Sequence, residues 1–506
     1  MTQRPRLPAT PSYRHRIVAA GGTLALVALV AGAAGAEEGS APPPVDAPTP
    51  APIDEIAPAP TETPPTPTTT LPSAEVEELR RRLDELERRL AAQPPPAAPA
   101  PAPAPAPLLR FQGYGELQAA LHDFGADQTR EGGAQRDLRL TLDTTRFVLE
   151  AIAARPFDVE LEAEIELEHG GTGAAMELEY EEFGEFELEV EKGGEVLLEE
   201  LFLTKRLGDN FALSAGRFYV AVGQLSRTYR PVDYLAVSRS EAESTVLPAV
   251  WDEMGVELAA WLPWLRATAQ VVNGLDSTGF SSHRFIALGH QRRFELVSAT
   301  DLAAVGRLDV FPAPDVEIGV AGYYGGTSRN RPKPDLVKEC ATSDDAVVAS
   351  CGYIDAPLAL LDAHGTFRLG PARGSALVVW GHLANAAAVS ARNERLSNAL
   401  AVPRTPVSDQ ALLAWGELGV DVAPWLALPA DHALEPFIRV DWYDTMFLPR
   451  ADLFDNPRFE RLVLTAGLSW AVANALVLKV DASHRRFASA ALATEESVRA
   501  SLGFVY

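Results

Sequence analysis

The chain has 506 residues, of which 47% are hydrophobic and 22% are charged. Its formal net charge of −25 at pH 7 argues against nucleic acid as a partner, because phosphate backbones attract basic surfaces. The charge says that the exposed parts are acidic, and it does not determine the fold.

The first 36 residues have the pattern of an export signal. Four arginines precede an apolar run over residues 17–34, and Ala34-Gly35-Ala36 has the small-x-small form of a cleavage site. We predict a signal peptide over residues 1–36. An uncleaved membrane anchor is the alternative, because the run is long enough to cross a bilayer. Both interpretations imply export. No later segment is a long apolar helix candidate, so any later membrane insertion would use strands.

Two low-complexity segments flank a short helical pattern. Residues 37–72 consist mainly of Pro, Ala, Thr and acidic residues, a composition that cannot bury a core, and we predict a disordered linker. Residues 94–107 form a Pro-Ala spacer that is expected to be extended and semi-rigid.

Between them, residues 73–93 predict a coiled-coil helix with Ser73 as its N-cap. Two heptads are marginal alone, so the helix makes sense within a larger assembly. A lone surface helix with an apolar stripe is the alternative. The apolar residues at alternating spacings of three and four are Val76, Leu79, Leu83, Leu86 and Leu90.

From residue 108 onward the pattern changes to a period of two. In residues 157–168, apolar residues alternate with acids, and no helix has that period. An edge strand of a soluble sheet shows this pattern, and so does a barrel strand with lipid outside and water inside.

Sixteen segments of this kind follow one another. The predicted strands span residues 110–123, 137–152, 157–168, 196–207, 211–221, 251–262, 265–273, 301–312, 315–325, 356–369, 375–385, 409–422, 434–445, 460–472, 475–487 and 496–506.

The connections alternate between short turns and long polar segments, with one of intermediate length at 423–433. Outer-membrane barrels have an even number of strands, short periplasmic turns and long external loops. We therefore predict an all-β chain, a transmembrane antiparallel β-barrel of about sixteen strands over 108–506, with a short N-terminal periplasmic coiled-coil helix. Both ends of the barrel region would then face the periplasm.

Three places depart from a regular pattern. The alternation shifts around Thr144–Arg146, which predicts a β-bulge in the second strand. Glu199 and Glu200 are adjacent, so one of them should face lipid, or the strand should begin later. Residues 176–191 alternate well enough to form a hairpin of their own, which we place in a long extracellular loop.

The last segment has one mostly apolar face that ends on Phe504 and Tyr506. Aromatic residues are typical of the membrane interface of a barrel. Such a final strand also looks like the signal by which the barrel-assembly machinery recognises Gram-negative outer-membrane proteins. We expect that machinery to be a partner through the strand ending in Tyr506.

The two cysteines, Cys340 and Cys351, lie close together in a polar stretch. In an oxidising compartment this spacing predicts a local disulfide. A zinc site is disfavoured, because no histidine or further cysteine stands nearby.

Several short sequence motifs occur in order along the chain. They are Gly113-Tyr114-Gly115-Glu116, SAGRFYVAVG at 214–223, VVNGLD at 271–276, GRLDVFPAPDVEIGVAGYYGGT at 306–327, LLDAHGTFRLGP at 360–371 and LEPFIRVDWYDT at 434–445.

In this order the motifs resemble the Gram-negative outer-membrane porin family of the phosphate-selective O/P type, and the resemblance covers residues 108–506. It implies a sixteen-stranded barrel, usually trimeric, that passes small hydrophilic solutes. Phosphate selectivity would need ladders of Arg and Lys along the lumen, and this chain departs from that.

Side chains on the polar face of each strand are the candidates for lining the lumen. They make the N-terminal wall acidic and the C-terminal wall mildly basic, which would set a field across the channel. The candidates are Glu160, Glu162, Glu164, Glu166, Asp362, Arg368, Arg439, Asp441, Lys479, Asp481, Arg485 and Arg499.

The long connection over 222–250 is the candidate for a loop that folds inward, as in similar porins, and narrows the pore. Its arginines could hold an anion through guanidinium contacts. An ordinary solvated loop, with arginines paired to neighbouring acids, explains the same residues. The constriction candidates are Arg227, Tyr229, Arg230, Asp233, Arg239 and Glu241.

The acidic region over 158–200 has two interpretations. It could collect cations at the mouth of a channel, or it could be a surface bridged by divalent ions to lipopolysaccharide phosphates. No Asp-rich loop has the spacing of a calcium site, so no metal site and no cofactor are predicted.

Together these features predict an outer-membrane porin for passive diffusion of small hydrophilic solutes or ions with weak charge selectivity. The alternatives are an anion- or phosphate-selective porin and a structural anchor tethered through the periplasmic helix. An enzyme is not expected, because the scattered histidines accompany no nucleophile motif. The expected partners are outer-membrane lipid and lipopolysaccharide, two further copies in a homotrimer, and, for the tethering alternative, peptidoglycan.

Overall fold

The computed structural model describes residues 73–91, 109–124, 137–155, 159–168, 174–180, 186–192, 195–290, 299–330, 354–394 and 405–506. The predicted signal peptide (1–36), linker (37–72), spacer (94–107) and disulfide (Cys340 and Cys351) lie outside the described residues. Helix α1 (Ser73–Ala91) belongs to one compact unit of the chain, and all the strands belong to a second.

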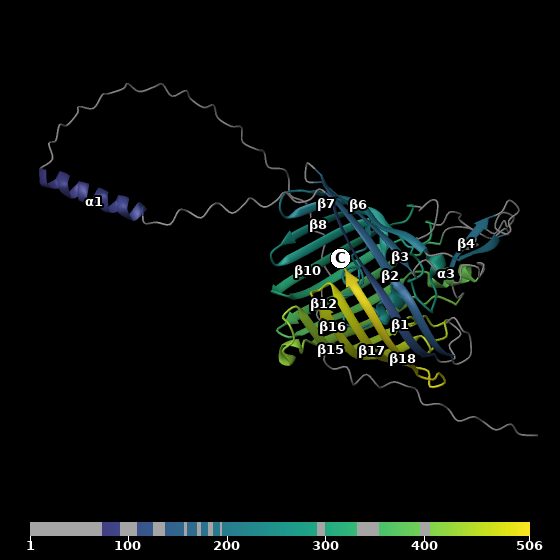
Figure 1. The fold of residues 1–506 in the computed structure, drawn as a ribbon. Helices are drawn as coiled ribbons and strands as arrows, with labels where there is room; N and C mark the ends of the chain where they lie inside the picture. The colour runs from purple at the N-terminus through teal and green to yellow at the C-terminus, as the bar shows by residue number, and fades with distance from the viewer. Residues whose placement is uncertain are drawn as a thin grey trace, which may run out of the picture. The chain divides into compact units, whose positions relative to one another are not determined.

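Sixteen antiparallel strands close into one barrel, in the order β1-β18-β17-β16-β15-β14-β13-β12-β11-β10-β9-β8-β7-β6-β3-β2 (Figure 1). The predicted strand number is therefore confirmed. The barrel strands are β1 (Leu109–Phe124), β2 (Asp137–Arg155), β3 (Val159–Glu168), β6 (Glu195–Arg206), β7 (Phe211–Tyr219), β8 (Asp252–Leu262), β9 (Leu265–Asn273), β10 (Leu302–Ala313), β11 (Val316–Gly325), β12 (Leu358–Leu369), β13 (Ala372–Leu383), β14 (Gln410–Val420), β15 (His432–Asp444), β16 (Glu460–Val472), β17 (Leu476–Phe487) and β18 (Glu495–Val505).

The connections place short turns at one end of the barrel and long segments at the other. For example, β8 ends at Leu262 and β9 begins at Leu265, whereas β9 ends at Asn273 and β10 begins at Leu302. In the long connection between β3 and β6, β4 (Ala174–Tyr180) and β5 (Phe186–Lys192) form a separate two-stranded sheet, as the sequence predicted. The turn between β14 and β15 contains the short 3₁₀ helix η6 (Ala423–Leu426).

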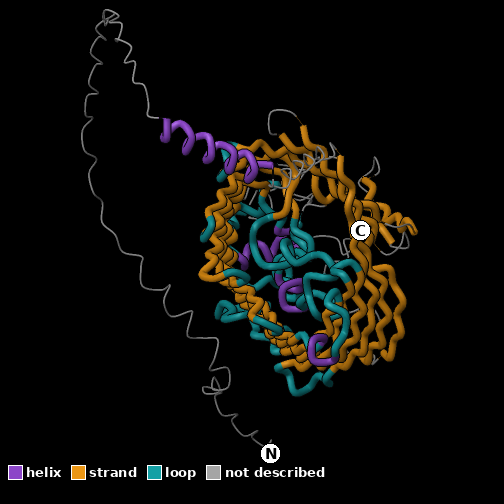
Figure 2. The backbone as a smooth tube through the Cα atoms, turned by 60° about the vertical axis from the view of Figure 1, so that its left-hand side comes forward, coloured by secondary structure: helices purple, strands orange, loops and turns teal. Residues whose placement is uncertain are grey.

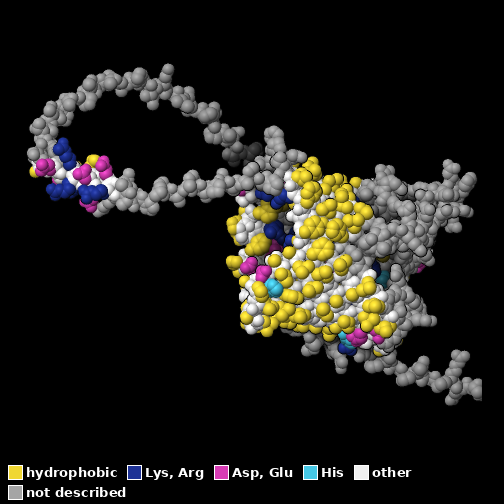
Figure 3. Space-filling view, viewed as in Figure 1, with side chains coloured by type: hydrophobic (Ala, Val, Ile, Leu, Met, Phe, Trp, Pro, Cys, Tyr) yellow, Lys and Arg dark blue, Asp and Glu magenta, His cyan; other side chains and the backbone are white. Residues whose placement is uncertain are grey.

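The outer face of the barrel is apolar. In β10 the exposed side chains are apolar, such as Leu302 (52%) and Leu308 (49%), whereas the alternate residues Arg307 and Asp309 are 3% and 1% exposed. Successive side chains of a strand point to opposite faces, so one strand supplies both a lipid-compatible face and a polar inner face. Figure 3 shows the resulting hydrophobic surface over the barrel strands.

Two β-bulges, on the strands that flank β3, reset this alternation. Glu116 pairs with Arg146 but Leu117 pairs with Thr144, so β2 has a bulge at Thr145, close to the position that the sequence predicted. Between β3 and β6, Glu164 pairs with Glu200 but Ile165 pairs with Leu198. Glu199 is therefore the extra residue of a second bulge.

The second bulge corrects one prediction. Neither Glu199 nor Glu200 faces lipid, because both side chains are buried, at 2% and 8% exposure. A regular strand would send them to opposite faces, and the bulge lets both point inward.

The barrel closes between β1 and β18, and aromatic rings cover the seam. Gly113 and Tyr506 exchange two backbone hydrogen bonds, of 3.0 and 2.9 Å. On the outer face, Phe504 and Tyr506 lie over Gly115 and Gly113, and both rings contact Phe147, with ring centroids 6.5 and 6.0 Å apart. The glycines leave room for the rings, so the aromatic residues predicted at the membrane interface also cover the closure of the barrel.

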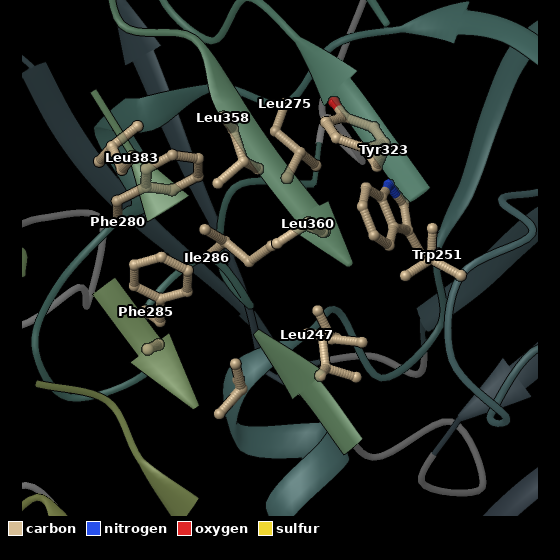
Figure 4. Close-up of a cluster of buried hydrophobic side chains, with 14 of the residues drawn as sticks. Leu247, Trp251, Leu275, Phe280, Phe285, Ile286, Tyr323, Leu358, Leu360 and Leu383 are labelled. Atoms are coloured by element: carbon tan, nitrogen blue, oxygen red, sulfur yellow. The ribbon is translucent and has the colours of Figure 1, made fainter. Parts of the chain in front are cut away.

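Part of the barrel interior is occupied by segments that connect the strands. Figure 2 shows connecting segments and short helices inside the ring of strands. Apolar side chains of these segments pack with inward residues of the strands in one cluster (Figure 4), and full burial of a Leu, Ile or Phe stabilises the fold by about 1.5–3 kcal/mol. Members of the cluster include Leu247, Trp251, Phe280, Phe285, Ile286, Tyr323, Leu358, Leu360 and Leu383.

Helix α1 carries an exposed apolar stripe. Leu79, Leu83 and Leu86 are 52%, 58% and 61% exposed, and Glu78 forms ion pairs with Arg81 and Arg82 on the polar side. This is the helix that the sequence predicted over 73–93. Among the described residues, no helix combines the length and the apolar composition needed to cross a bilayer.

Candidate functional site: a segment folded into the barrel

Residues 220–251, which connect β7 to β8, cross the inside of the barrel; we call them the inner segment. Its backbone N–H groups donate to carboxylates on distant strands: Gly223 to Asp362 of β12 at 2.8 Å and Val237 to Asp481 of β17 at 2.7 Å. These strands are far around the barrel from β7 and β8. The segment is therefore anchored on the opposite wall.

Helix α2 (Glu241–Val246) organises the middle of the inner segment. Ser240 is its N-cap and accepts from Glu243 N, while the Ser240 hydroxyl donates to Asp441 of β15 at 2.5 Å. The Glu243 carboxylate accepts from Gln224 N at 2.6 Å, Leu225 N at 2.9 Å and the Trp415 indole at 3.0 Å. Burial raises the pKa of Glu243 to about 7, although these three donors act in the opposite direction.

The predicted constriction residues have different surroundings. Arg227 donates to Asp309 at 2.8 Å and to Glu317 at 2.9 Å, and Arg230 pairs with Asp233 at 2.9 Å. Both guanidiniums are thus matched by carboxylates, but only Arg230 pairs with a neighbouring acid of its own segment, whereas Arg227 pairs with acids of β10 and β11.

The other three candidates are Tyr229, Arg239 and Glu241. Glu241 accepts from Arg485 at 2.5 Å and from the Tyr443 hydroxyl at 2.7 Å, so it ties α2 to β15 and β17. Tyr229 and Arg239 border a cavity described below, and Arg239 donates to Ala249 O at 3.3 Å.

A group of potential metal ligands is held by guanidiniums. Asp309, Glu317 and His364 bring ligand atoms within 4.8 Å of one another. Arg227 donates to both carboxylates, and Arg307 Nε donates to Asp309 at 2.9 Å. The arginines supply the positive charge that the carboxylates need, so this group is an ion-pair network.

The C-terminal lumen candidates point inward and lie beneath the inner segment. Arg439 pairs with Asp441 at 3.0 Å, and Arg499 pairs with Asp481 at 2.7 Å. Lys479 Nζ donates to Ala236 O of the inner segment at 3.0 Å and is 1% exposed. Lys479 thus helps to hold the inner segment in place. Because Arg439 and Arg499 pair with acids, opposite charges largely cancel on this wall.

The two candidates of β12 differ in exposure. Asp362, at 5% exposure, contacts His364 and Gly223 N, whereas Arg368 is exposed near the turn end of β12. Arg485 of β17 also pairs with Glu495.

The N-terminal wall, formed by β2, β3 and β6, carries an excess of carboxylates. Glu164 and Glu166 are buried, at 1% and 0% exposure, whereas Glu160 and Glu162 are partly exposed. Arg146 of β2 is a buried cation on this wall, and it pairs with Glu166 and, at 2.5 Å, with Glu199. The two bulges bring Arg146 and Glu199 together inside the barrel.

A cavity of about 170 Å³ lies between the inner segment and strands β1 and β2. Tyr114 and Arg146 are the functional candidates that sequence reasoning missed here. The shift in alternation at Thr144–Arg146 predicted a bulge but not the direction of Arg146, and nothing local distinguished Tyr114. The cavity is lined by Tyr114, Glu116, Gln118, Arg146, Tyr229, Pro231, Tyr234, Val237, Ser238 and Arg239.

No family model matches the chain, and no curated protein matches its sequence. Similar solved structures include the outer-membrane channel DcaP of Acinetobacter baumannii, with 10% identity over 79% of this chain and 97% of that chain and a TM-score of 0.44. OprB of Pseudomonas putida at high pH has 9% identity over 79% and 94%, with a TM-score of 0.45. An anion-selective porin from Comamonas acidovorans has 9% identity over 79% and 99%, with a TM-score of 0.43.

These similarities are too weak to indicate a shared function, and the fold assignment rests on the strand order itself. The resemblance to phosphate-selective porins therefore stays a prediction.

Proposed function

We propose that this protein is an outer-membrane porin through which small hydrophilic solutes and ions diffuse passively, with a weak preference for cations. The observation that carries the proposal is the division of the closed barrel into an apolar outer face and a polar inner face crossed by the inner segment. An apolar band outside and a polar interior are what a bilayer-spanning channel requires.

The cation preference follows from the uneven charge of the interior. Arg439 and Arg499 of the C-terminal wall are buried or partly buried and paired with acids, whereas Glu160 of β3 is partly exposed. Fixed carboxylates beside a narrow aqueous path raise the local concentration of cations.

The anion-selective alternative has less support. Of the three arginines that would hold an anion, Arg227 and Arg230 already contact carboxylates, and Arg239 alone of the three lines the cavity among the described residues. An excess of anion current would require the pairs on Arg227 and Arg230 to open.

The structural-anchor alternative rests on helix α1, whose apolar stripe is exposed in a single chain. Assembly into a homotrimer, and contacts with lipopolysaccharide, peptidoglycan and the barrel-assembly machinery, belong to the same proposal. An anchor can also conduct, so α1 adds to the porin proposal and does not compete with it.

The reversal potential of the purified protein in a planar bilayer under a KCl gradient tests the function. We expect stepwise conductance with a permeability ratio of K⁺ to Cl⁻ above one. The variant Glu160→Gln should lower that ratio, because it removes a partly exposed carboxylate of the acidic wall. Anion preference that is lost in Arg227→Gln/Arg230→Gln/Arg239→Gln would support the phosphate-type alternative. The absence of any conductance would contradict the porin proposal.

A further inference from the structure

The cavity beside β1 and β2 contains hydrogen-bond donors that the protein leaves unused. The Tyr114 side chain is 4% exposed, and its hydroxyl has no hydrogen-bond partner among the described residues. Arg146 Nη1 is also buried and has no hydrogen-bond partner among the described residues. The other two nitrogens of this guanidinium, Nε and Nη2, contact Glu166 and Glu199. Buried donors without partners are costly, so such donors facing a cavity point to a ligand that accepts hydrogen bonds.

Positive and negative charge are both present at the cavity but lie on different side chains. Arg239 contacts no carboxylate among the described residues, and its one hydrogen bond, to Ala249 O, is 3.3 Å long. Arg146 is matched by its two glutamates. Glu116 provides a carboxylate that also lines the cavity and accepts from the Tyr234 hydroxyl at 2.8 Å.

The tyrosines extend this arrangement toward the acidic wall. Tyr114 and Tyr229 lie 5.8 Å apart between ring centroids, and Tyr229 and Tyr219 lie 5.9 Å apart. The Tyr219 hydroxyl donates to Glu199 at 2.8 Å and to Glu164 at 3.2 Å. Tyr219 therefore links this series of rings to carboxylates of β3 and β6.

We propose that this cavity is an affinity site for a small zwitterion of the α-amino acid class, within the path that the proposed porin function supplies. The solute carboxylate accepts from Arg239 and from the Tyr114 hydroxyl, and its ammonium group lies toward Glu116. A simple anion would meet the glutamates, and a simple cation would meet two guanidiniums. A molecule with both charges satisfies both sides.

The size of the cavity agrees with this class. A volume of about 170 Å³ admits a solute with few carbon atoms, and the tyrosine rings provide a flat apolar face for a short side chain. The donors and acceptors stand on β1, β2 and the inner segment, so binding depends on the inner segment being in its folded-in position.

The test compares four solutes with a three-carbon skeleton in single-channel recordings at pH 7: L-alanine, propionate, isopropylammonium and propane-1,2-diol. We expect L-alanine to reduce the K⁺ current in a saturable manner at a lower concentration than the other three. Arg239→Gln should raise its half-saturating concentration about tenfold, the effect of losing one charge-assisted hydrogen bond. Tyr114→Phe should raise it by a smaller factor.

Arg450→Gln is the matched control, because it removes the same charge from an arginine that pairs with Asp452 at 3.0 Å outside the cavity. The zwitterion inference is overturned if conductance is normal but L-alanine acts no better than the other solutes. It is also overturned if Arg239→Gln and Arg450→Gln change the half-saturating concentration equally. The absence of conductance overturns the porin proposal itself, and the inference with it.

Discussion

At the scale of single residues, the seam between β1 and β18 depends on the absence of side chains. Gly113 and Gly115 alternate with the inward residues Tyr114 and Glu116, so both glycines face outward. There they are covered by Phe504 and Tyr506, and the Tyr506 hydroxyl donates to Val148 O of β2 at 3.1 Å. The aromatic residues thus contact three strands at the point of closure.

Gly115→Ala should weaken this closure. A Cβ atom at this position would lie 2.5 Å from Phe504 Cζ, so the ring must move. Overpacking of this kind costs about 1–3 kcal/mol. We expect the folded barrel to lose its compact gel mobility at a lower temperature than the wild type.

Gly306→Ala is the matched control for that measurement. Gly306 also faces outward, on β10, but an added Cβ atom would meet nothing within 4 Å. Equal transition temperatures for the two variants would show that the aromatic cover of Gly115 is not needed for closure.

At the scale of elements, the inner segment is held near its start and in its middle. Asp362 anchors it at Gly223, Asp441 anchors it at Ser240, and Glu243 joins residues 224–225 to helix α2 and to β14. Backbone N–H groups inside a barrel cannot all hydrogen-bond to bulk water, and here several of them donate to carboxylates instead.

Glu243 should make the stability of this arrangement depend on pH. Its pKa is raised by burial to about 7, whereas a glutamate in an unfolded chain titrates near 4.3. Between these values the folded state keeps a proton that the unfolded state has lost. Stability contributed by the protonated side chain is therefore present at low pH and is lost as the pH rises toward 7. Each pKa unit corresponds to about 1.4 kcal/mol.

The transition temperature of the wild type and of Glu243→Gln between pH 4 and pH 8 measures this effect. We expect the transition temperature of the wild type, relative to that of the variant, to be highest near pH 4 and to fall as the pH rises toward 7. Asp209→Asn removes an exposed carboxylate in the turn between β6 and β7 and serves as the control. Parallel pH profiles for wild type and Glu243→Gln would contradict the assignment.

At the scale of the whole molecule, the interior of the barrel is divided. One part is filled by the apolar cluster of Figure 4, whose strand members lie on β7 and on strands from β9 to β16. The cavity and the excess carboxylates lie instead beside β1, β2, β3 and β6. We therefore expect solutes to pass close to the N-terminal strands, away from the barrel centre.

The apolar stripe of α1 should contribute to assembly of the full-length protein. Leu79, Leu83 and Leu86 are exposed in one chain and would be buried against equivalent helices. The variant Leu79→Gln/Leu83→Gln/Leu86→Gln should dissociate into monomers at a lower temperature in detergent, as measured by light scattering. Arg80→Gln/Arg88→Gln changes the polar face and is the control. An unchanged dissociation temperature in the leucine variant would assign assembly to the barrel alone.

The strands and their order along the chain could be predicted from the sequence because both are local properties. An alternation with a period of two identifies a strand whatever its neighbours are, and β10 shows the expected apolar outer face residue by residue. Short turns and long connections then indicate which strands pair in sequence. The bulge near Arg146 was also visible, because it interrupts a local pattern.

Only the tertiary structure decided which inward residues border open space. Arg439, Asp441 and Lys479 belong to the inner face by alternation, yet a segment about 200 residues earlier in the chain covers them. Arg227 likewise meets its carboxylates on β10 and β11. Such contacts depend on where a long connection docks, and docking is determined by the joint fit of many donors and acceptors from distant strands. No local pattern encodes that fit, so the candidate site emerged from the fold.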